Sequence, residues 1–371
     1  MDNIYLFGIS IWKRERVKHF FPDTNLTFVD RDSDSFDRSV DRVIVWGRES
    51  FPKAIGRAKE LEIPILFMED GFIRSISLGL DFAQNYSTVL DSRGIYFDTT
   101  APNDLEDILN SYKFDSELLK RARRVQRAIV ESRISKYNIY RDKKLDIDTS
   151  KYKKAILVVG QVEDDASVIY GASGMKNLEL LKLVYFSNPK SYIIYKPHPD
   201  TVKGRREGRI SKREALKYAN RIETKVSIDT LLDIADEVHT ITSLVGLEAL
   251  LRNKRVVCYG VPFYAGWGLT CDKRKISRER RDLKLLELIA AAYILYPKYI
   301  SPKSLEPCEV EEVLRELKAQ KELYHSSLKY RIEVNIKNFI YKKSFAVERN
   351  LNALSNIFTK AGSRVKKIFG D

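Results

Sequence analysis

Two segments of the sequence place polar side chains directly after an apolar, strand-like run, and both are suited to binding a phosphate. In the first, Lys196 and His198 can each present a hydrogen-bond donor to an anion, and the two flanking prolines restrict the backbone that holds them. In the second, Thr242 and Ser243 are expected at the N-cap of a helix, where hydroxyls and unpaired N–H groups meet the positive end of the helix dipole. Open α/β sheets bind phosphate-bearing ligands at such strand ends. The two segments together predict a nucleotide-linked substrate.

Glu248 follows one to two turns into the same predicted helix. Its carboxylate can accept hydrogen bonds from the hydroxyls of a ribose, although a surface carboxylate is the simpler alternative. The other polar groups also have ordinary structural roles, because serine and threonine cap many helices and a single histidine often bonds only its neighbours. The combination of the segments, and not any one residue, therefore favours a ligand site.

A third segment, Gly160 to Gly171, concentrates the adjacent acids Glu163, Asp164 and Asp165 at the carboxyl end of another predicted strand. Adjacent carboxylates repel one another, so such a cluster is favoured where it faces a cation or takes part in acid, base or nucleophile chemistry. The alternative is an N-cap at Asp165 with the other two acids solvated.

Two further loops are candidates for the rest of the site. Glu69, Asp70 and Arg74 follow a predicted strand in the first part of the chain and are expected to face the acidic segment across a cleft. The loop with Tyr264 and Trp267 combines aromatic rings with glycines, which suits stacking on a base or covering a sugar. Packing alone is the alternative for this loop.

An alternation of strands and helices has to position these segments. The first part of the chain contains strand-like runs at 4–7, 26–29, 42–46 and 64–68, then a helix over 115–132 and a polar stretch over 140–152. A second series follows, with strands at 154–159, 192–195, 237–240 and 255–259 and helices at 175–185, 228–235 and 245–253. Each series predicts a mostly parallel sheet with crossover helices.

Length and composition fit two α/β lobes with an added helical region. A chain of 371 residues is longer than a single hydrophobic core usually supports. We expect a first lobe over residues 1–150, a second over 151–282, and helices that pack back on the lobes over 283–371. Three cysteines without a CxxC pair and four histidines argue against a zinc site or a disulfide framework. No apolar run is long enough to span a bilayer, so we expect a cytoplasmic protein.

The net charge of +14 comes from 65 Lys and Arg against 51 Asp and Glu, and it allows nucleic acid, an anionic membrane or acidic substrates as partners. Part of the excess lies in residues 203–213 and part in the tail after Lys329. In that tail, apolar residues from Val347 to Ile368 recur at spacings of three and four, which predicts a basic amphipathic helix. We expect it to pack on the first lobe, to contact the inner face of an anionic membrane, or to bind another subunit.

Taken in this order, the segments resemble the capsular polysaccharide β-Kdo transferases. The resemblance covers about Ile4 to Pro302 and is carried by Glu69 to Ser75, Gln161 to Ser167, Lys196 to Pro199, Thr242 to Leu251 and Tyr264 to Thr270. It implies a GT-B-like α/β fold, in which two Rossmann-type lobes face a central cleft and the second lobe binds CMP-β-Kdo. It also implies a retaining glycosyltransferase that adds Kdo to a Kdo-terminated acceptor on phosphatidylglycerol, as in the poly-Kdo linker of capsular polysaccharide.

For the retaining reaction that the resemblance implies, residue type and loop position suggest which side chains take part. Glu163 is expected to be the nucleophile with Asp164 or Asp165 in support, and Asp70 or Glu69 is expected to activate the acceptor hydroxyl. No cofactor or metal is expected, because protein cations and helix N-termini can neutralise a nucleoside monophosphate leaving group. The residues expected to bind substrate are Arg74, Gln161, Lys196, His198, Thr242, Ser243, Glu248, Tyr264 and Trp267.

One departure from the family pattern bears on the linkage. Full-length relatives carry two related modules, and this chain has one. Modules of one type place an aspartate directly before the glutamine of the acidic segment, whereas this chain has Gly160. It looks like the other type, which implies a β-(2→7) linkage instead of β-(2→4).

Two other functions stay open. A transferase for CMP-sialic acid or another CMP-ulosonic acid would suit the same phosphate-binding segments. A basic module that binds nucleic acid or a membrane would explain the charge but not the three adjacent acids, which repel phosphates. No recognisable nucleic-acid-binding motif is present, so nucleic acid is not expected as a partner.

Overall fold

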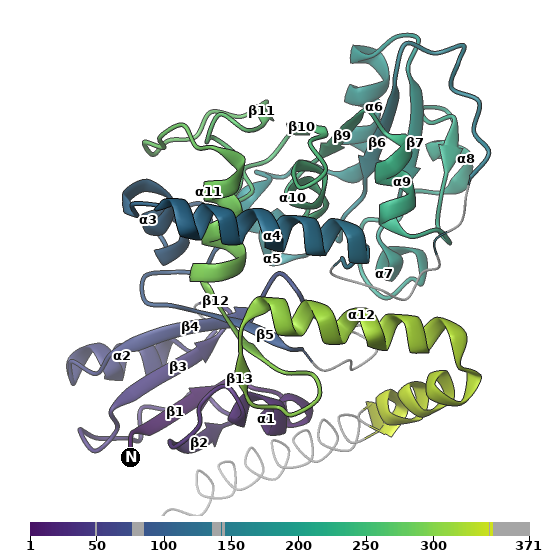
Figure 1. The fold of residues 1–371 in the computed structure, drawn as a ribbon. Helices are drawn as coiled ribbons and strands as arrows, with labels where there is room; N and C mark the ends of the chain where they lie inside the picture. Colours follow the sequence, from purple (N-terminus) through teal and green to yellow (C-terminus); the bar gives the residue numbers. More distant parts are fainter. Residues whose placement is uncertain (49, 76–84, 136–141, 143–144, 341, 344–371) are drawn as a thin grey trace, which may run out of the picture.

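The computed structural model describes residues 1–48, 50–75, 85–135, 142, 145–340 and 342–343, and two β-sheets organise it (Figure 1). The first sheet has the strand order β13-β12-β5-β4-β3-β1-β2. Strands β1 to β4 run parallel to one another. Strand β5 runs antiparallel to β4, β12 runs antiparallel to β5, and β13 runs antiparallel to β12. Its strands are β1 (Asn3–Phe7), β2 (Asn25–Val29), β3 (Arg42–Trp46), β4 (Ile65–Asp70), β5 (Ser87–Asp91), β12 (Pro297–Ile300) and β13 (Pro307–Cys308).

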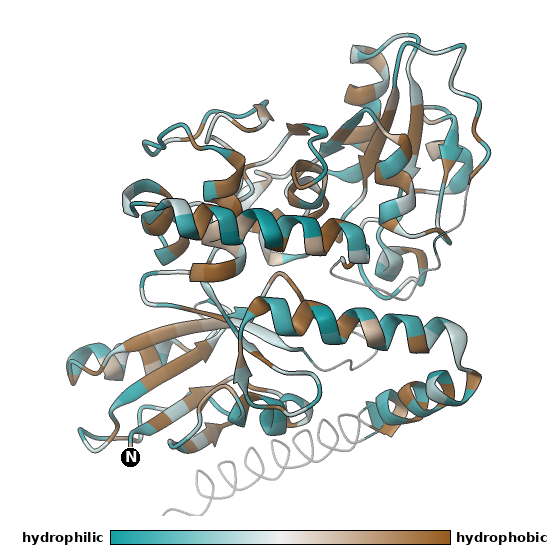
Figure 2. Ribbon diagram, in the orientation of Figure 1, coloured by the Kyte–Doolittle hydropathy of each residue, from teal (hydrophilic) through white to brown (hydrophobic). Residues whose placement is uncertain are grey.

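The second sheet is parallel throughout and has the order β11-β10-β9-β6-β7-β8. Its strands are β6 (Ala155–Val159), β7 (Tyr192–Lys196), β8 (Arg221–Ile222), β9 (Glu237–Thr240), β10 (Arg255–Cys258) and β11 (Cys271–Asp272). All five residues of β6, Ala-Ile-Leu-Val-Val, are buried. Parallel sheets are covered on both faces by helices, which is why the central strand β6 is a continuous apolar run (Figure 2).

Helices surround both sheets. Those that accompany the first sheet in sequence are α1 (Ile11–Lys18), α2 (Pro52–Glu60), α3 (Asp104–Ser111) and α4 (Ser116–Ser132). Those within the second series are α5 (Ala166–Gly171), α6 (Asn177–Ser187), α7 (Pro199–Val202), α8 (Lys212–Ala215), α9 (Ile228–Ile234) and α10 (Val245–Leu250). The last are α11 (Leu285–Ala290), which continues into a π-helical turn (Ala291–Leu295), and α12 (Val310–Ser326).

The two α/β lobes predicted from the sequence are confirmed. Every strand predicted for either series is present within a residue or two of its expected position. The region after residue 283, which was expected to be helical, also contains strands β12 and β13, and both join the first sheet. The chain therefore returns from the second lobe to the first, where β12 pairs with β5.

Helices α3 and α4 follow the first sheet in sequence, and α4 packs mainly against α11 and α12. Asp115 caps α4 by accepting the Leu118 N–H, and Ala122, Val125 and Ile129 form its buried stripe. This stripe belongs to one apolar cluster that contains Val89 of the first sheet together with residues of the second lobe such as Val159, Leu231 and Leu250. Figure 1 shows α4 crossing between the sheets. One core therefore connects the lobes.

The end of the chain is described in part. Residues 328–340 form a further helix after α12. The predicted amphipathic helix from Val347 to Ile368 lies outside the described residues, as do residues 140, 141, 143 and 144 of the predicted linker over 140–152.

Candidate active site

A cavity of about 550 Å³ lies between the lobes, and residues of both sheets line it. The second lobe contributes the loops that follow β6, β7 and β9, and the first lobe contributes α1 and the end of β4. All of these loops leave the carboxyl ends of parallel strands, where α/β proteins bind their ligands. The sequence-predicted residues in the lining are Glu69, Asp70, Arg74, Gln161, Asp165, Lys196, His198, Thr242, Ser243 and Glu248.

Gln161 bonds to protein atoms through both its side chain and its backbone. Its Nε2 donates to Thr242 Oγ1 at 2.9 Å, and its Oε1 accepts the Thr242 backbone N–H at 2.8 Å. Its backbone is held in turn by Asn177, whose amide Oδ1 accepts the Gln161 N–H and whose Nδ2 donates to the Gln161 carbonyl. Gln161 therefore positions the Thr242 turn at the edge of the cavity.

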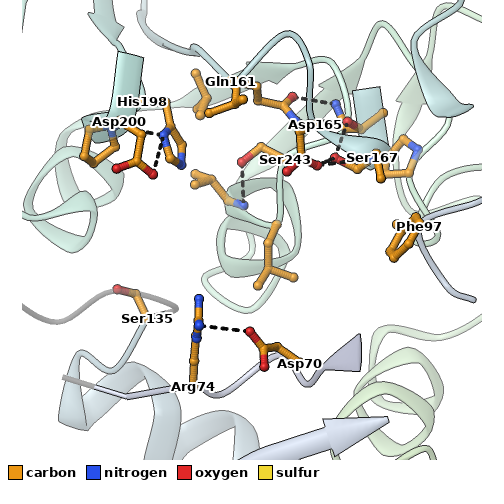
Figure 3. Close-up of a pocket in the computed structure, with 18 of the residues that line it drawn as sticks. Asp70, Arg74, Phe97, Ser135, Gln161, Asp165, Ser167, His198, Asp200 and Ser243 are labelled. Atoms are coloured by element: carbon orange, nitrogen blue, oxygen red, sulfur yellow. Dashed lines mark hydrogen bonds and ion pairs between the residues drawn. The ribbon is translucent and has the colours of Figure 1, made fainter. Parts of the chain in front are cut away.

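The turn from Thr242 to Leu244 differs in detail from the expected cap. The N-cap residue of α10 is Leu244, which makes no side-chain cap hydrogen bond. The Thr242 hydroxyl accepts from Gln161, and the Ser243 Oγ accepts the Val245 N–H at 3.3 Å. The Ser243 hydroxyl nevertheless lies at the start of α10 and lines the cavity (Figure 3). Glu248, one turn into α10, is buried and lines the cavity as well.

Lys196 ends strand β7 and is buried at the floor of the cavity. Its Nζ donates to the Val226 carbonyl at 2.8 Å. Burial lowers the pKa of Lys196 to about 8, because a charged ammonium loses hydration there, although the Glu223 carboxylate opposes the shift. The residue therefore changes charge near neutral pH.

His198 caps α7 through its Nδ1, which also lies 3.7 Å from the Asp200 carboxylate. The Asp200 backbone N–H donates to His198 Nδ1 at 3.2 Å. When Nδ1 accepts, a neutral imidazole carries its proton on Nε2, which then becomes a donor. Figure 3 shows His198 and Asp200 together on one side of the cavity. His198 thus has both a structural role and a donor that suits an anionic ligand.

The three adjacent acids separate in the structure. Asp165 caps α5, accepting the Ser167 N–H and hydroxyl at 3.0 and 2.7 Å, and lines the cavity. The Glu163 carboxylate is outside the lining, where Oε1 accepts the Asn177 N–H at 2.8 Å and Oε2 pairs with Lys176 at 3.2 Å.

The third acid, Asp164, also lies outside the lining. It pairs with Arg206 at 2.9 Å on the rim. Of the three, Asp165 is the carboxylate that a ligand in the cavity can meet.

On the first-lobe side, Asp70 is bracketed by two cations. Arg74 Nη2 lies 3.0 Å from Asp70 Oδ2, and Lys13 Nζ lies 3.4 Å from Asp70 Oδ1. Glu69 lines the same wall, and its Oε1 accepts the Asp70 N–H at 2.9 Å. Figure 3 shows Arg74 extending from this wall toward the second-lobe residues.

The expected ligand contacts of Tyr264 and Trp267 are not supported, because both side chains are fully buried and neither lines the cavity. The Tyr264 hydroxyl donates to the Ser243 carbonyl, and Trp267 Nε1 donates to the Phe263 carbonyl at 2.8 Å. Their rings belong to the shared core. Tyr264 and Trp267 therefore pack in the core behind the cavity wall, whereas the neighbouring Phe263 lines the cavity.

Several residues that line the cavity were not predicted as site residues from the sequence. No local pattern marks the aromatic residues of the first lobe, and Lys13 is one of several cations on a short helix. Asp200 gave a weak signal, as an acid in the first turn after the prolines. These residues are Trp12, Lys13, Trp46, Tyr96, Phe97, Ser135, Ser167, Asp200, Arg206 and Phe263.

Within the described residues, no group of three or more His, Cys, Asp or Glu side chains is arranged to hold a metal ion. A search of the same residues for a helix with the length and hydropathy to cross a membrane finds none.

Comparison with known proteins gives consistent matches. The family model of capsule polysaccharide biosynthesis proteins matches residues 41–299. The capsule polysaccharide modification protein LipA of Neisseria meningitidis serogroup A is 44% identical over 327 residues, which cover 86% of this chain and 46% of LipA. The chain therefore spans about half the length of this curated relative.

Two solved structures share the whole two-lobe arrangement. The β-Kdo 2,4 transferase of Thermosulfurimonas dismutans KpsC has a TM-score of 0.75 and 32% identity, covering 85% of this chain and 98% of that one. The β-Kdo 2,7 transferase of the same KpsC has a TM-score of 0.68 and 36% identity, covering 86% and 100%. Identity is higher to the second and structural similarity to the first. The GT-B-like fold class expected from the sequence is confirmed.

Proposed function

The chain belongs to the family of capsule polysaccharide biosynthesis proteins, and we propose on this premise that it is a glycosyltransferase that transfers Kdo. The observation that carries the proposal is the cavity between the lobes. It brings the donor groups Lys196, His198 and Ser243 together with the carboxylate of Asp165, opposite the first-lobe acids. The similarity to two Kdo transferase modules supports Kdo as the sugar.

We propose that the second lobe binds CMP-β-Kdo through its phosphate. Lys196 supplies positive charge, His198 Nε2 a neutral donor and Ser243 a hydroxyl at the start of α10. Glu248, which lines the cavity, is the proposed acceptor for the ribose hydroxyls. As the bond between Kdo and phosphate breaks, these groups stabilise the charge that develops on the leaving CMP.

We propose a two-step reaction with retention, in which Asp165 is the nucleophile in place of Glu163. The Asp165 carboxylate attacks the anomeric carbon and CMP leaves, giving a glycosyl ester. The acceptor hydroxyl then attacks the same carbon, its proton passes to a carboxylate base, and Asp165 is released. Glu69 is the proposed base, because the Asp70 carboxylate is already paired with two cations.

The acceptor and linkage are proposed from the family likeness. We propose a Kdo-terminated, lipid-linked acceptor and a β-(2→7) linkage, which the higher identity to the 2,7 module favours. Gly160 agrees with this choice in one respect. A Cβ built at Gly160 would lie 2.6 Å from the Tyr195 hydroxyl, so an aspartate at this position would require Tyr195 to move.

We also propose peripheral contact with an anionic membrane. In the helix over residues 328–340, large apolar side chains on one face are between 49% and 65% exposed. These are Leu328, Ile332, Ile336, Phe339 and Ile340. Residues 328–343 also carry Lys329, Arg331, Lys337, Lys342 and Lys343 against the single acid Glu333. Amphipathic helices with this composition bind at the interface of anionic bilayers.

A transfer assay tests the function. The purified protein is incubated with CMP-Kdo generated in situ and a synthetic Kdo-terminated acceptor, and NMR determines the anomeric configuration and linkage of the product. CMP-sialic acid serves as the competing donor. Transfer from CMP-sialic acid with no transfer from CMP-Kdo would overturn the assignment of the sugar.

Two variants test the nucleophile. Asp165→Asn should lose transfer by at least about 10³-fold, and Glu163→Gln should retain most of it when corrected for folded protein. Mass spectrometry of wild-type protein quenched with donor alone should locate the ester on Asp165. An ester on Glu163, or equal losses in both variants, would contradict the assignment.

A further inference from the structure

Helix α5 lies between the proposed nucleophile and the first lobe. Asp165 begins this helix and belongs to it through both its side chain and its backbone. The Asp165 carboxylate accepts the Ser167 N–H at 3.0 Å, and its carbonyl accepts the N–H groups of Val168 and Ile169 at 3.0 and 2.9 Å. With six residues, α5 is about 9 Å long. A helix this short moves as a rigid unit, so a displacement of its carboxyl end also displaces Asp165.

Tyr170, near the carboxyl end of α5, contacts the first lobe. Its ring stacks on that of Phe97, with centroids 6.4 Å apart and an interplanar angle of 27°, and the Arg48 guanidinium carbon lies 5.9 Å from the ring centre. Phe97 follows β5 and Arg48 follows β3, so both partners belong to the first lobe. Figure 3 shows Phe97 on the side of the cavity where Asp165 and Ser167 lie. Tyr170 itself is outside the cavity lining.

Asp98 braces the first-lobe loop that carries Phe97. The Asp98 carboxylate is buried, forms an ion pair with Arg48, and accepts the N–H and the hydroxyl of Thr100 at 2.8 and 2.5 Å. Asp98 therefore holds Arg48 beside the loop that contributes Phe97. The two first-lobe contacts of Tyr170 are thus fixed relative to each other.

A second connection joins the same end of α5 to the same loop. The Thr99 hydroxyl donates to the Val261 carbonyl at 3.0 Å, and the Val261 N–H donates to the Gly171 carbonyl at 2.9 Å. Gly171 is the last residue of α5, and a Cβ built there would lie only 2.8 Å from the methyl group of Thr242. The first lobe, α5 and the Thr242 turn therefore meet at one place.

We propose that Tyr170 is a positioning residue, because contact of its ring with Phe97 and Arg48 holds α5 where the Asp165 carboxylate reaches the anomeric carbon of the donor. This role rests on the proposed function, with Asp165 as the nucleophile. Attack requires the reacting atoms to lie about 3–3.5 Å apart, and a misplacement of about 1 Å can cost about 100-fold in rate. Since the contacts come from the lobe opposite the donor-binding loops, Asp165 is placed for attack only while the two lobes are together.

The steady-state test removes the Tyr170 ring. Tyr170→Ala should lower kcat about 10- to 100-fold. The KM values for donor and acceptor should stay within about twofold of wild type, because Tyr170 does not line the cavity. Tyr170→Phe keeps the ring and should retain nearly all of kcat. Ile169→Ala is the matched control, since this neighbouring side chain on α5 is 61% exposed, and it should leave kcat unchanged.

The affected step is measured with donor alone. Attack by Asp165 then forms the glycosyl ester and releases CMP, and Tyr170→Ala should slow ester formation about 10- to 100-fold. The effect of Tyr170→Ala should shrink when Phe97→Ala is already present, because the contact is then missing in both proteins. Thermal unfolding curves correct each rate for the fraction of folded protein.

Hydrogen exchange gives a readout that does not require transfer. The N–H groups of Val168 and Ile169 bond to the Asp165 carbonyl, so their exchange rates report on the order of α5. Tyr170→Ala should raise these rates at least about fivefold, while the amides of α6 exchange as in wild type.

Three results would overturn the inference. The first is an unchanged kcat in Tyr170→Ala, and the second is unchanged exchange at Val168 and Ile169 in that variant. The third is an ester on a residue other than Asp165, which would leave the transferase function standing but remove the reacting group from α5. If the wild-type protein transfers no Kdo, the proposed function fails, and the hold of Tyr170 on α5 is judged by exchange alone. Equal exchange in wild type and Tyr170→Ala would then refute it.

Discussion

The carboxamide of Gln161 holds Thr242 at two points, with its Nε2 on the Thr242 hydroxyl and its Oε1 on the Thr242 backbone N–H. Both residues are buried, although 81 positions separate them in the sequence. The pair joins the loop after β6 to the loop after β9. The acidic segment and the turn at Thr242 are therefore held together.

Loss of this connection should impair activity more than stability. Gln161→Ala leaves the Thr242 N–H without its partner, and we expect a loss of about 1–3 kcal/mol in the free energy of unfolding. We expect transfer to fall about 10- to 100-fold, since the turn is no longer held at the cavity. Chemical denaturation and steady-state kinetics measure the two effects.

Gln126→Ala is the control for that variant. Gln126 Nε2 donates to the Leu251 carbonyl at 2.9 Å, away from the cavity lining. It should lose similar stability with kinetics near wild type. If both variants lose activity in proportion to stability, Gln161 has no role beyond folding.

Nucleotide affinity should depend on pH through Lys196. Its folded-state pKa of about 8 lies below the usual value of 10.5 because the residue is buried. Lys196 is therefore charged below about pH 8 and neutral above it. CMP binding measured by calorimetry should stay constant from about pH 7 to 8 and then weaken by up to tenfold per pH unit.

The variant Lys196→Met should bind CMP weakly at every pH and show no step near pH 8. Lys212→Met, an exposed lysine on α8 of the same lobe, should reproduce the wild-type profile. A wild-type profile that is flat up to about pH 10 would exclude Lys196 as the titrating group.

A side chain at position 160 should conflict with Tyr195. The Tyr195 ring occupies the space in which a Cβ of residue 160 would lie, with the hydroxyl 2.6 Å away. We expect Gly160→Ala to lower the free energy of unfolding by about 1–3 kcal/mol through overpacking. The double variant Gly160→Ala with Tyr195→Phe should recover much of this loss, because the hydroxyl is the closest atom.

Gly56→Ala provides the comparison for that substitution. Gly56 lies within α2 and a Cβ there meets no atom within 4 Å. Alanine should therefore stabilise the helix by up to about 1 kcal/mol. Thermal denaturation of Gly160→Ala, of its double variant with Tyr195→Phe and of Gly56→Ala, each beside wild type, measures these changes in stability. An unchanged stability of Gly160→Ala would refute the steric explanation.

Membrane contact should depend on the exposed face of residues 328–340. A triple variant, Ile332→Ser, Ile336→Ser and Phe339→Ser, removes apolar area that would enter the bilayer interface. Its binding to vesicles containing phosphatidylglycerol should fall at least about tenfold in a flotation assay. Wild-type binding should also weaken with salt and with replacement of the anionic lipid by phosphatidylcholine.

Phe186→Ser is the control for the flotation assay, because Phe186 is 71% exposed on α6 of the second lobe. It should float like wild type. If the triple variant floats normally but loses concentration-dependent self-association, a second copy of the chain is the occupant of this face.

The sheets were predictable because their strands are apolar runs between turn signals. β6 and β7 show this well, since each is nearly or fully buried and ends at a polar segment. β12 was missed because its four residues directly follow an apolar helical turn, and its strand conformation depends on pairing with β5. Pairing across more than 200 residues leaves no local pattern.

The site was predictable on the second lobe and less so on the first. Lys196 and His198 follow a clear strand, whereas Lys13 reaches the cavity only because β1 lies beside β3 in the sheet. Tyr264 shows the opposite error, because it was expected to contact the ligand and lies in the core. The Tyr264 ring packs so closely against Gly246 that a Cβ there would lie 2.1 Å from the Tyr264 hydroxyl. An aromatic–glycine pattern does not say which side a ring will face.

The apolar cluster that includes α4 extends from Val89 in one sheet to Val159 and Leu250 around the other. Without the other half, each half of the molecule would expose its part of this shared cluster to water. Separately expressed halves should consequently aggregate, and the whole chain should melt in a single cooperative transition instead of two. The smallest unit that should fold independently is accordingly the complete pair of sheets, including strand β12.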